Sequence, residues 1–353
     1  MALYAQGRSA LLSATSAPIA AHVNLQSFNT FGIAAHAKRF IAIDSTESLR
    51  SILLADKDDT PRFILGGGSN ILLTRDFPGL VMRIQVMGKR VVSRDEEATL
   101  VESGAGENWN EFVRWTLDQD LAGLENLSLI PGMVGAAPIQ NIGAYGVEMK
   151  DTFHSLTAMD VRDGSLKTFN RDDCEFAYRD SVFKRELKDR YIITSVTFRL
   201  PHGAKRHLDY GDIRTELNRV SCENPSAREV SDAICAIRRR KLPDPAVIGN
   251  AGSFFKNPMV EREVLARIQS KHDTLPHYPA SDGKVKLAAG WLIEQCGWKG
   301  KSLGRAGVHE QHALVLVNRG GATGLEILAL ARAIQHSVRE QFQVELEPEP
   351  VIV

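Results

Sequence analysis

The pattern of apolar and polar positions predicts many short strands along the chain. Apolar runs of a few residues, bounded by glycine, proline or charged residues, are typical of strands in a packed sheet. Such runs occur at 39–43, 63–65, 71–73, 80–84, 100–101, on both sides of the Asp163-Gly164 turn, and at 191–200, 313–317 and 344–353. No repeat and no low-complexity linker interrupts them.

Apolar residues at helical spacing predict helices between these strands. Asp44 or Ser45 can cap a helix that runs through Leu53, and Asn108 can cap another that runs through Leu117. Further helices are expected at 229–240, where Pro243 follows the last turn, and at about 260–271, 286–296 and 325–342. Together these elements predict an α+β protein built of three closely packed units.

The composition is that of a globular protein without a surplus of either charge. The 353 residues include 43 Lys and Arg and 43 Asp and Glu, so the formal net charge is zero. Nucleic-acid binding depends on surplus basic residues, so that function is not expected. The four cysteines are scattered, as is typical of reduced thiols in the cytosol. With no long apolar run and no export signal, we expect a cytoplasmic protein without membrane insertion.

Three segments imitate known motifs but have the wrong spacing. In Gly66-Gly67-Gly68-Ser69-Asn70-Ile71, isoleucine stands where the dinucleotide fingerprint Gly-x-Gly-x-x-Gly requires its last glycine. A P-loop ending at Gly300-Lys301-Ser302 would need glycine in place of Gln295. A zinc-protease helix beginning at His309-Glu310 would need histidine in place of Ala313. The sequence therefore indicates no Rossmann motif, no P-loop and no metal site.

Two glycine-rich loops are the candidates for ligand binding. Successive glycines at 66–70 allow positive φ angles and let main-chain N–H groups converge on an anion such as a pyrophosphate. A flexible hairpin turn is the alternative explanation. The stretch 131–146 is long for a connection and rich in small residues, with Gln140 and Asn141 as neutral donors and acceptors, which suits a flavin. A purely structural glycine loop would explain the same residues, so the loops alone leave the ligand open.

Taken in order, the motifs resemble those of the UDP-N-acetylenolpyruvoylglucosamine reductase (UDP-N-acetylmuramate dehydrogenase) family. The matching segments are Asn29-Thr30-Phe31-Gly32, 66–70, Gly104-Ala105-Gly106-Glu107-Asn108-Trp109, Leu124-Glu125-Asn126-Leu127, 131–146, Tyr178-Arg179-Asp180-Ser181-Val182-Phe183-Lys184, Lys241-Leu242-Pro243-Asp244-Pro245, 249–258, Lys286-Leu287-Ala288-Ala289-Gly290-Trp291-Leu292-Ile293 and Leu346-Glu347-Pro348-Glu349. The segment Tyr210-Gly211-Asp212 is similar to that of family members whose tyrosine-bearing loop folds over the substrate. Only residues 1 to about 24 fall outside the resemblance.

The resemblance implies an FAD-binding fold of the vanillyl-alcohol oxidase type, with two α/β subdomains, followed by a C-terminal α+β substrate-binding domain. The implied boundaries are a flexible extension at 1–24, FAD-binding subdomain 1 at 25–88, FAD-binding subdomain 2 at 89–242, and the substrate-binding domain at 243–342. A C-terminal strand at 343–353 is expected to join the first subdomain. A monomer is expected.

The cofactor implied by the resemblance is FAD, held non-covalently. NADPH and a UDP-sugar are expected to take turns in one cleft, and a monovalent cation is expected as an activator. The residues implied for FAD are Gly66, Gly67, Gly68, Ser69 and Asn70 near the pyrophosphate, and Pro131, Gly135, Ala136, Pro138, Gln140, Asn141, Gly143, Ala144 and Tyr145, of which those from Pro138 to Tyr145 lie near the ring.

The implied reaction is the reduction of UDP-N-acetylglucosamine enolpyruvate to UDP-N-acetylmuramate, a step in peptidoglycan precursor synthesis. By motif match, Ser253 donates the proton and Arg179 holds the substrate carboxylate with a forked cation. Glu349, protonated or bridged to Arg179, is expected to help stabilise the enolic intermediate. The substrate-binding positions implied by the family are Tyr210, Lys241, Asn257 and Tyr278. His312 receives no role.

Other functions are compatible with parts of the pattern. Another flavin-dependent alcohol oxidase or dehydrogenase on the same fold is the main alternative, and it predicts reaction of the reduced flavin with oxygen. A serine hydrolase built on Ser253 would be expected to carry a Gly-x-Ser-x-Gly elbow, which the sequence lacks. A catalytically silent binding protein would have no need of Arg179, Ser253 and Glu349 together.

Overall fold

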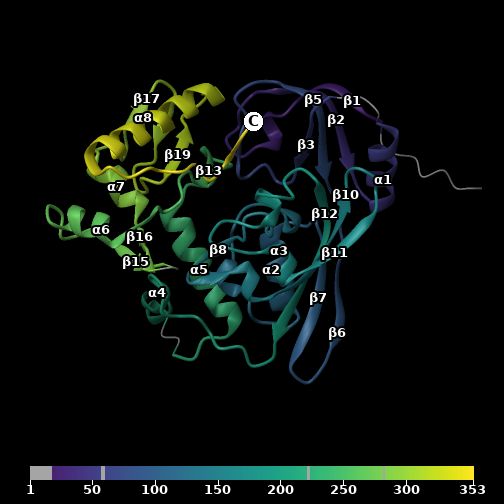
Figure 1. The fold of residues 1–353 in the computed structure, drawn as a ribbon. Coiled ribbons are helices and arrows are strands. Elements are labelled where there is room, and N and C mark those ends of the chain that lie inside the picture. Colours follow the sequence, from purple (N-terminus) through teal and green to yellow (C-terminus); the bar gives the residue numbers. More distant parts are fainter. Residues whose placement is uncertain (1–17, 57–59, 221–222, 281–282) are drawn as a thin grey trace, which may run out of the picture.

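The computed structural model describes residues 18–56, 60–220, 223–280 and 283–353. These residues form three units, of which the first two are each built on one main β-sheet and the third on two. Figure 1 shows the first unit in purple and blue at the upper right, the second in teal below it, and the third in green and yellow at the upper left. Within the described residues, no helix has both the length and the apolar character needed to cross a membrane.

The first unit is a four-stranded sheet in the order β1-β2-β5-β3, in which β5 pairs in parallel with both β2 and β3. Its elements are β1 (Ala20–Asn24), η1 (Gln26–Phe28), β2 (His36–Ile43), α1 (Thr46–Ala55), β3 (Arg62–Leu65) and β5 (Phe77–Ile84). Helix α1 begins where the sequence predicted, because the Ser45 side chain accepts a hydrogen bond from the N–H of Ser48. Residues 20–24 were expected to be part of a flexible extension, but they form β1 and pair with β2; residues 1–17 of that prediction lie outside the described residues.

The second unit is a five-stranded antiparallel sheet in the order β11-β10-β12-β7-β6. Its strands are β6 (Lys89–Arg94), β7 (Ala98–Gly104), β10 (Phe153–Asp160), β11 (Leu166–Asn170) and β12 (Tyr191–Pro201). Its helices and turns are α2 (Trp109–Asp118), η2 (Glu125–Leu127), η3 (Val134–Ala136), η4 (Met149–Asp151), α3 (Arg171–Cys174), η5 (Val182–Lys184), α4 (Ile213–Arg219) and α5 (Ala227–Lys241), with a small hairpin of β8 (Gly143–Ala144) and β9 (Val147–Glu148). Asn108 caps α2 as predicted, and Ser226 and Glu229 form a capping box at the start of α5.

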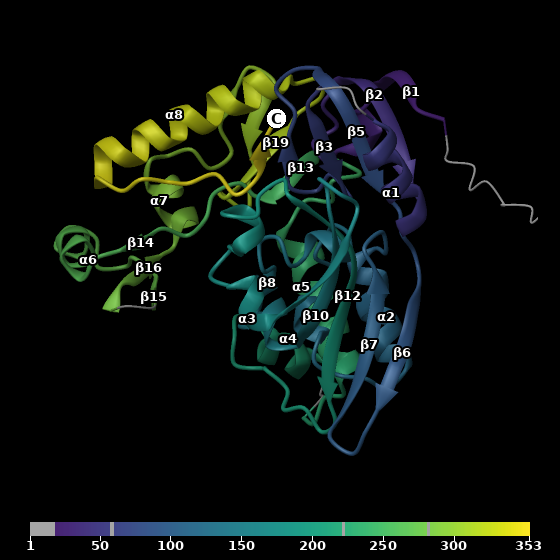
Figure 2. The same cartoon turned by 45° about the vertical axis from the view of Figure 1, so that its right-hand side comes forward.

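The third unit combines a four-stranded sheet, β13-β19-β18-β17, with a three-stranded sheet, β14-β16-β15. Its elements are β13 (Gly249–Ser253), β14 (Met259–Val260), α6 (Arg262–Gln269), β15 (His277–Pro279), β16 (Val285–Leu287), α7 (Ala289–Gln295), β17 (Ser302–Leu303), β18 (Ala306–Val308), β19 (Val315–Asn318) and α8 (Gly324–Phe342). Figure 2 shows that α6 and the three-stranded sheet project away from α8 and the rest of the molecule. The helix predicted at 286–296 begins only at Ala289, because residues 285–287 pair with β14 and β15 instead.

The chain returns to the first unit at its C-terminal end. Strand β20 (Val351–Ile352) pairs in parallel with β4 (Ile71–Leu72), which directly follows the glycine loop at 66–70. The rest of the predicted strand 344–353 does not pair in a sheet, although Pro348 bridges to Phe255. As a result, Glu349 lies beside the first glycine-rich loop.

Two hydrophobic cores meet at the first sheet. Leu80 and Met82 point into a core shared with the second unit, whereas Val81 between them points into a core shared with the third unit. This alternation is the expected period of a strand that is buried on both faces. A separate small core joins α4 and α5, and Tyr145 packs against it.

The segment Asn29-Thr30-Phe31 links the first glycine-rich loop to the third unit. The Thr30 N–H donates to the carbonyl of Gly68 at 3.1 Å, and the Thr30 carbonyl accepts from the N–H of Asn250 at 3.0 Å. The Asn29 side chain bonds to main-chain groups on both sides of the segment and holds it in shape. Thr30 therefore fixes the glycine loop relative to β13, the strand that ends at Ser253.

Candidate active site

The first glycine loop (residues 66–70) connects β3 to β4. The main-chain N–H groups of Gly67, Gly68 and Ser69 donate no hydrogen bond to any described residue. Gly68 has a φ of 62°, so the main chain curves there as it does in an anion-binding nest. Free N–H groups on a curved glycine loop suit a phosphate group, and this loop fits the pyrophosphate of FAD.

The second glycine loop (residues 131–146) lies directly against the first. The Ser69 hydroxyl donates to the carbonyl of Pro131 at 3.2 Å, and a Cβ atom on Gly67 would lie 3.1 Å from the Cα atom of Gly132. Gly135 and Ala136 form η3, and Pro138 is buried just after it. The two loops therefore form one glycine-lined surface, and their close approach depends on small side chains.

The amides of this surface are used in different ways. Asn70 donates to the side-chain oxygen of Gln140 at 2.6 Å, and the Gln140 amide is 3.4 Å from Oε1 of Glu349. Asn141 is buried, with φ at 43°, and its amide donates to Glu148 and to the carbonyl of Ala177, each at 3.0 Å. The Asn141 side chain thus shapes the loop from within, and we expect its contribution to a flavin site to come from the main chain.

Arg179 and Glu349 form an ion pair at one end of the second glycine loop. Nε of Arg179 lies 3.4 Å from Oε1 of Glu349, and Nη2 of Arg179 donates to the carbonyl of Gly143 at 2.6 Å. Both side chains are largely buried, with 19% and 15% of their surfaces exposed. Burial raises the pKa of Glu349, and the neighbouring Arg179 cation opposes that rise. The pair thus combines a fixed cation with a carboxyl group whose proton affinity is increased.

Ser253 lies on the segment next to Glu349. It ends β13, and the carbonyl of the following residue, Phe254, accepts a hydrogen bond from the N–H of Glu349 at 2.8 Å. The hydroxyl of Ser253 makes no hydrogen bond to a described residue. The structure therefore places Arg179 and Glu349 in contact and brings the segment of Ser253 beside Glu349.

The four predicted substrate-binding residues come from the second and third units. Tyr210 is half exposed, and its ring meets the edge of the Tyr145 ring at a centroid distance of 6.4 Å. Lys241 pairs with Asp212 at 2.6 Å. Asn257 accepts a hydrogen bond from the N–H of the first residue of α7, and the exposed Tyr278 lies on β15. Lys241 and Asn257 therefore already have protein partners, so a ligand would have to share or replace them.

Comparisons with known proteins match the chain to one enzyme family. Residues 244–353 match the C-terminal domain of UDP-N-acetylenolpyruvoylglucosamine reductase, and residues 37–170 match an FAD-binding domain. A protein named UDP-N-acetylenolpyruvoylglucosamine reductase from Pseudomonas aeruginosa is 54% identical over 330 residues, which is 93% of this chain and 97% of that protein. A protein of the same name from Dechloromonas aromatica is 52% identical over 94% of this chain and 98% of its own length.

The chain belongs to the UDP-N-acetylenolpyruvoylglucosamine reductase family. The solved structure of the family member from Thermus caldophilus shares the fold, with a TM-score of 0.64 and 24% identity over 95% of this chain and 98% of that one. The expected α+β class is confirmed, as is an FAD-binding domain followed by a C-terminal domain of this family. The expectation of an FAD-dependent oxidoreductase is confirmed with it.

The site of this reductase also contains cations that the sequence did not single out. The positive charges of Lys184 and Lys256, like that of Arg179, lower the pKa of the Glu349 carboxyl group. Lys286 lies between two aromatic rings, with its Nζ 4.6 Å from the centre of the Tyr178 ring. Lys184, Lys286 and Tyr178 stand inside motifs that match the family, but a motif match does not say which way a side chain points. Lys256 also forms an ion pair with Glu347, at 2.6 Å, so these cations share the region with a second carboxyl group.

His312 is partly buried and lies close enough to Lys241 for that cation to affect its pKa. Its Nδ1 atom is buried and has no hydrogen-bond partner among the described residues, and burial lowers its pKa. Positive charges on Lys241, Lys299 and Arg238 also lower the pKa of His312. The described residues contain no cluster of His, Cys, Asp and Glu side chains that could hold a metal ion.

Proposed function

We propose that this chain catalyses the NADPH-dependent reduction of UDP-N-acetylglucosamine enolpyruvate to UDP-N-acetylmuramate, with FAD as bound cofactor, in the synthesis of peptidoglycan precursors. The observation that carries the proposal is the Arg179–Glu349 pair, at 3.4 Å, placed between the glycine-lined surface and the segment of Ser253. We assign the enzyme to the cytoplasm and expect a monomer. These assignments rest on the family and on the composition of the chain.

FAD, when bound, supplies hydride transfer between NADPH and the substrate. Addition of hydride to the terminal carbon of the enolpyruvyl double bond leaves an electron pair on the carbon that carries the carboxylate. We assign Arg179 to hold this carboxylate, because its guanidinium group is permanently charged and can donate two parallel hydrogen bonds. A fixed cation at this position favours the state in which negative charge has accumulated.

Ser253 is assigned to protonate the carbon atom that carries this electron pair. A serine hydroxyl is a weak acid, but the carbanion-like centre is a strong base, so a well-placed hydroxyl is sufficient. The hydroxyl has no hydrogen-bond partner among the described residues, which supports this role. We assign Glu349 to stabilise the enolic form of the substrate carboxylate, either protonated or through Arg179. Burial raises the pKa of Glu349, which is the direction that favours its protonated form.

The diphosphate and uridine parts are assigned to Tyr210, Lys241, Asn257 and Tyr278. Lys241 supplies a positive charge, and the other three supply directional hydrogen bonds. In this structure Lys241 is paired with Asp212. A diphosphate group carries more charge than Asp212, so it would favour the replacement of Asp212 as the partner of Lys241. An alcohol oxidase on the same fold is not supported, because the family match covers both the FAD-binding domain and the C-terminal domain.

The test is a visible absorption spectrum of the purified holoenzyme, recorded first with anaerobic NADPH and then with the enolpyruvyl sugar nucleotide. We expect NADPH to bleach the flavin absorbance and the sugar nucleotide to restore it. Ser253→Ala should slow only the restoration, by about 100-fold or more, whereas Ser51→Ala, which removes an exposed hydroxyl on α1, should behave like the wild type. If the colour returns only with oxygen, the enzyme is an oxidase and the proposal is wrong.

A further inference from the structure

Arg179 occupies a main-chain conformation that a non-glycine residue seldom adopts. Its φ is 54°, in the left-handed region, where a residue with a Cβ atom loses about 1–2 kcal/mol. The turn closes through hydrogen bonds in both directions between Ala177 and Asp180, so Arg179 is its third residue. A positive φ at that position is typical of type II turns, which usually place glycine there. The arginine is therefore held in place by its surroundings.

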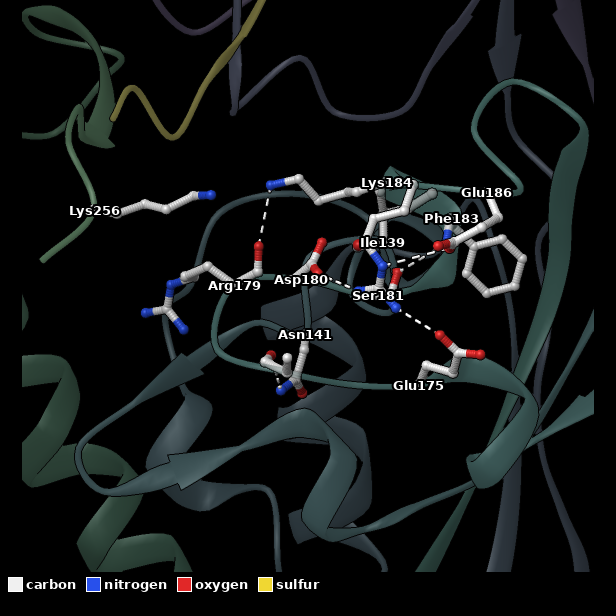
Figure 3. A network of polar contacts seen from close by, with 12 residues as sticks. Ile139, Asn141, Glu175, Arg179, Asp180, Ser181, Phe183, Lys184, Glu186 and Lys256 are labelled. Carbon is white, nitrogen blue, oxygen red and sulfur yellow. Dashed lines mark hydrogen bonds and ion pairs between the residues drawn. The ribbon is translucent and has the colours of Figure 1, made fainter. Parts of the chain in front are cut away.

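The side chain of Lys184 forms a hydrogen bond to the main chain of this turn. Its Nζ donates to the carbonyl of Arg179 at 3.1 Å, as Figure 3 shows. Lys184 is half-buried and forms no ion pair with a described carboxylate. Burial lowers the pKa of its ammonium group, and the nearby Lys256 cation lowers it further, while the more distant carboxylates of Asp180, Glu347 and Glu349 oppose this. A partly desolvated cation without a carboxylate in contact is unfavourable by itself, so the bond to Arg179 is its main interaction within the protein.

The base of Lys184 is anchored to the second glycine loop. Lys184 ends η5, and the Ser181 side chain accepts from the N–H of Phe183 at the start of that turn. The Ser181 hydroxyl also donates to the carbonyl of Ile139 at 2.6 Å. Figure 3 shows this chain of contacts running from Ile139 through Ser181 to the turn that carries Arg179. The ammonium group of Lys184 thus reaches Arg179 from a fixed base.

We propose that Lys184 is a positioning residue of the reductase: its ammonium group fixes the main chain of Arg179, so that the Arg179 guanidinium group stays in contact with Glu349. This inference rests on the proposed function. The positive charge of Lys184 also acts on Glu349, together with Arg179 and Lys256, and favours its ionised form. Lys184 itself has no contact with the substrate in this proposal.

The test uses three holoenzyme variants: Lys184→Met, Lys184→Arg and Lys188→Met, the last of which removes an exposed cation from the same loop. Stopped-flow absorbance follows bleaching by NADPH and recovery with the enolpyruvyl sugar nucleotide. Loss of a charged hydrogen bond should slow recovery in Lys184→Met about tenfold or more. Bleaching and FAD content should change less than about twofold, because the flavin loops keep their own hydrogen bonds. Lys184→Arg should restore most of the recovery rate.

Two further measurements separate positioning from general stabilisation. In Lys184→Met the pH dependence of recovery should shift to higher pH, since a cation that favours ionised Glu349 has been removed. In an Arg179→Ala background, Lys184→Met should slow recovery by a smaller factor than in the wild-type background, because the part of its effect that passes through Arg179 is already lost. A Lys184→Met enzyme that recovers like Lys188→Met, or that loses bleaching and FAD in parallel with recovery, contradicts the inference. Failure of the proposed function itself would be visible earlier, as a wild-type enzyme that the sugar nucleotide does not reoxidise.

Discussion

Replacement of Gly68 by alanine should damage the FAD site far more than the same change at Gly66, two residues away. Gly68 is buried, has a φ of 62°, and its carbonyl accepts the hydrogen bond from Thr30. A Cβ atom at this position would lie 2.0 Å from the carbonyl oxygen of Phe28 and 2.9 Å from the Cα atom of Asn29. A Cβ atom on Gly66 would meet its nearest neighbours at 3.8 Å, which is ordinary van der Waals contact.

The size of the effect follows from these distances. Carbon and oxygen atoms that start 2.0 Å apart must separate by at least 1.0 Å to reach the 3.0 Å below which real Cβ atoms are essentially never found (3.0 − 2.0 = 1.0). Overpacking of this kind costs about 1–3 kcal/mol, and alanine in the left-handed region adds about 1–2 kcal/mol. We therefore expect Gly68→Ala to lower the free energy of unfolding by about 2–5 kcal/mol. Gly66→Ala should change it by less than about 1 kcal/mol.

The assay is thermal denaturation together with FAD absorbance per protein after gel filtration. A loss of 2–5 kcal/mol should lower the melting temperature by roughly 4–20 °C, at about 2–4 °C per kcal/mol for domains of 150–250 residues. FAD retention should fall as well, because the displaced loop carries the free N–H groups of Gly67 and Ser69. Equal melting temperatures and equal FAD content in the two variants would refute the reasoning.

Three more outcomes are expected. The free energy of unfolding of Glu349→Gln should exceed that of the wild type, and the difference should grow with pH. The growth begins at about 4.3, the ordinary glutamate pKa, and continues through the raised pKa of Glu349. The reason is that ionisation of a buried carboxyl group destabilises the wild-type fold. Denaturant unfolding at several pH values measures this, and a pH-independent difference would contradict it. Trp109→Phe should lower the free energy of unfolding by about 1–3 kcal/mol, because it leaves the buried carbonyl of Leu127 without its 2.9 Å hydrogen bond. Urea denaturation should then show a lower midpoint at an unchanged slope. Asn126→Ala should raise KM for the sugar nucleotide about threefold to tenfold while kcat changes less, because the Asn126 amide ties the second glycine loop to the segment that leads to Tyr210; an unchanged KM would count against that link.

The elements that could be predicted from the sequence are those whose signals are local. The cap at Asn108 and the Asp163-Gly164 turn between β10 and β11 depend only on residues close in the chain. Strand β16 was missed because Lys286 to Ala289 are good helix formers, and the strand exists only through pairing with β14 and β15, a tertiary effect that overrides local propensity. Strand β1 was missed for the same reason, because its partner β2 supplies the hydrogen bonds.

The candidate site divides in a similar way. The motifs named Arg179, Ser253 and Glu349; the structure pairs Arg179 with Glu349 and places the segment of Ser253 beside Glu349. The motifs could not say that the Asn141 amide is used inside its own loop, or that Lys184 points back to the Arg179 carbonyl. Those facts depend on the orientation of side chains between segments that are linked only through the fold.

The pairing of β20 with β4 has a consequence for the order in which the enzyme becomes active during synthesis. Among the residues assigned to catalysis, Glu349 leaves the ribosome last, more than 270 residues after the glycine loop beside which it lies (349 − 70 = 279). Until the C-terminal residues are made, the first unit lacks the strand that pairs with β4 and much of the core that it shares with the third unit. We therefore expect the FAD-binding site and the catalytic carboxyl group to be completed together, at the end of synthesis.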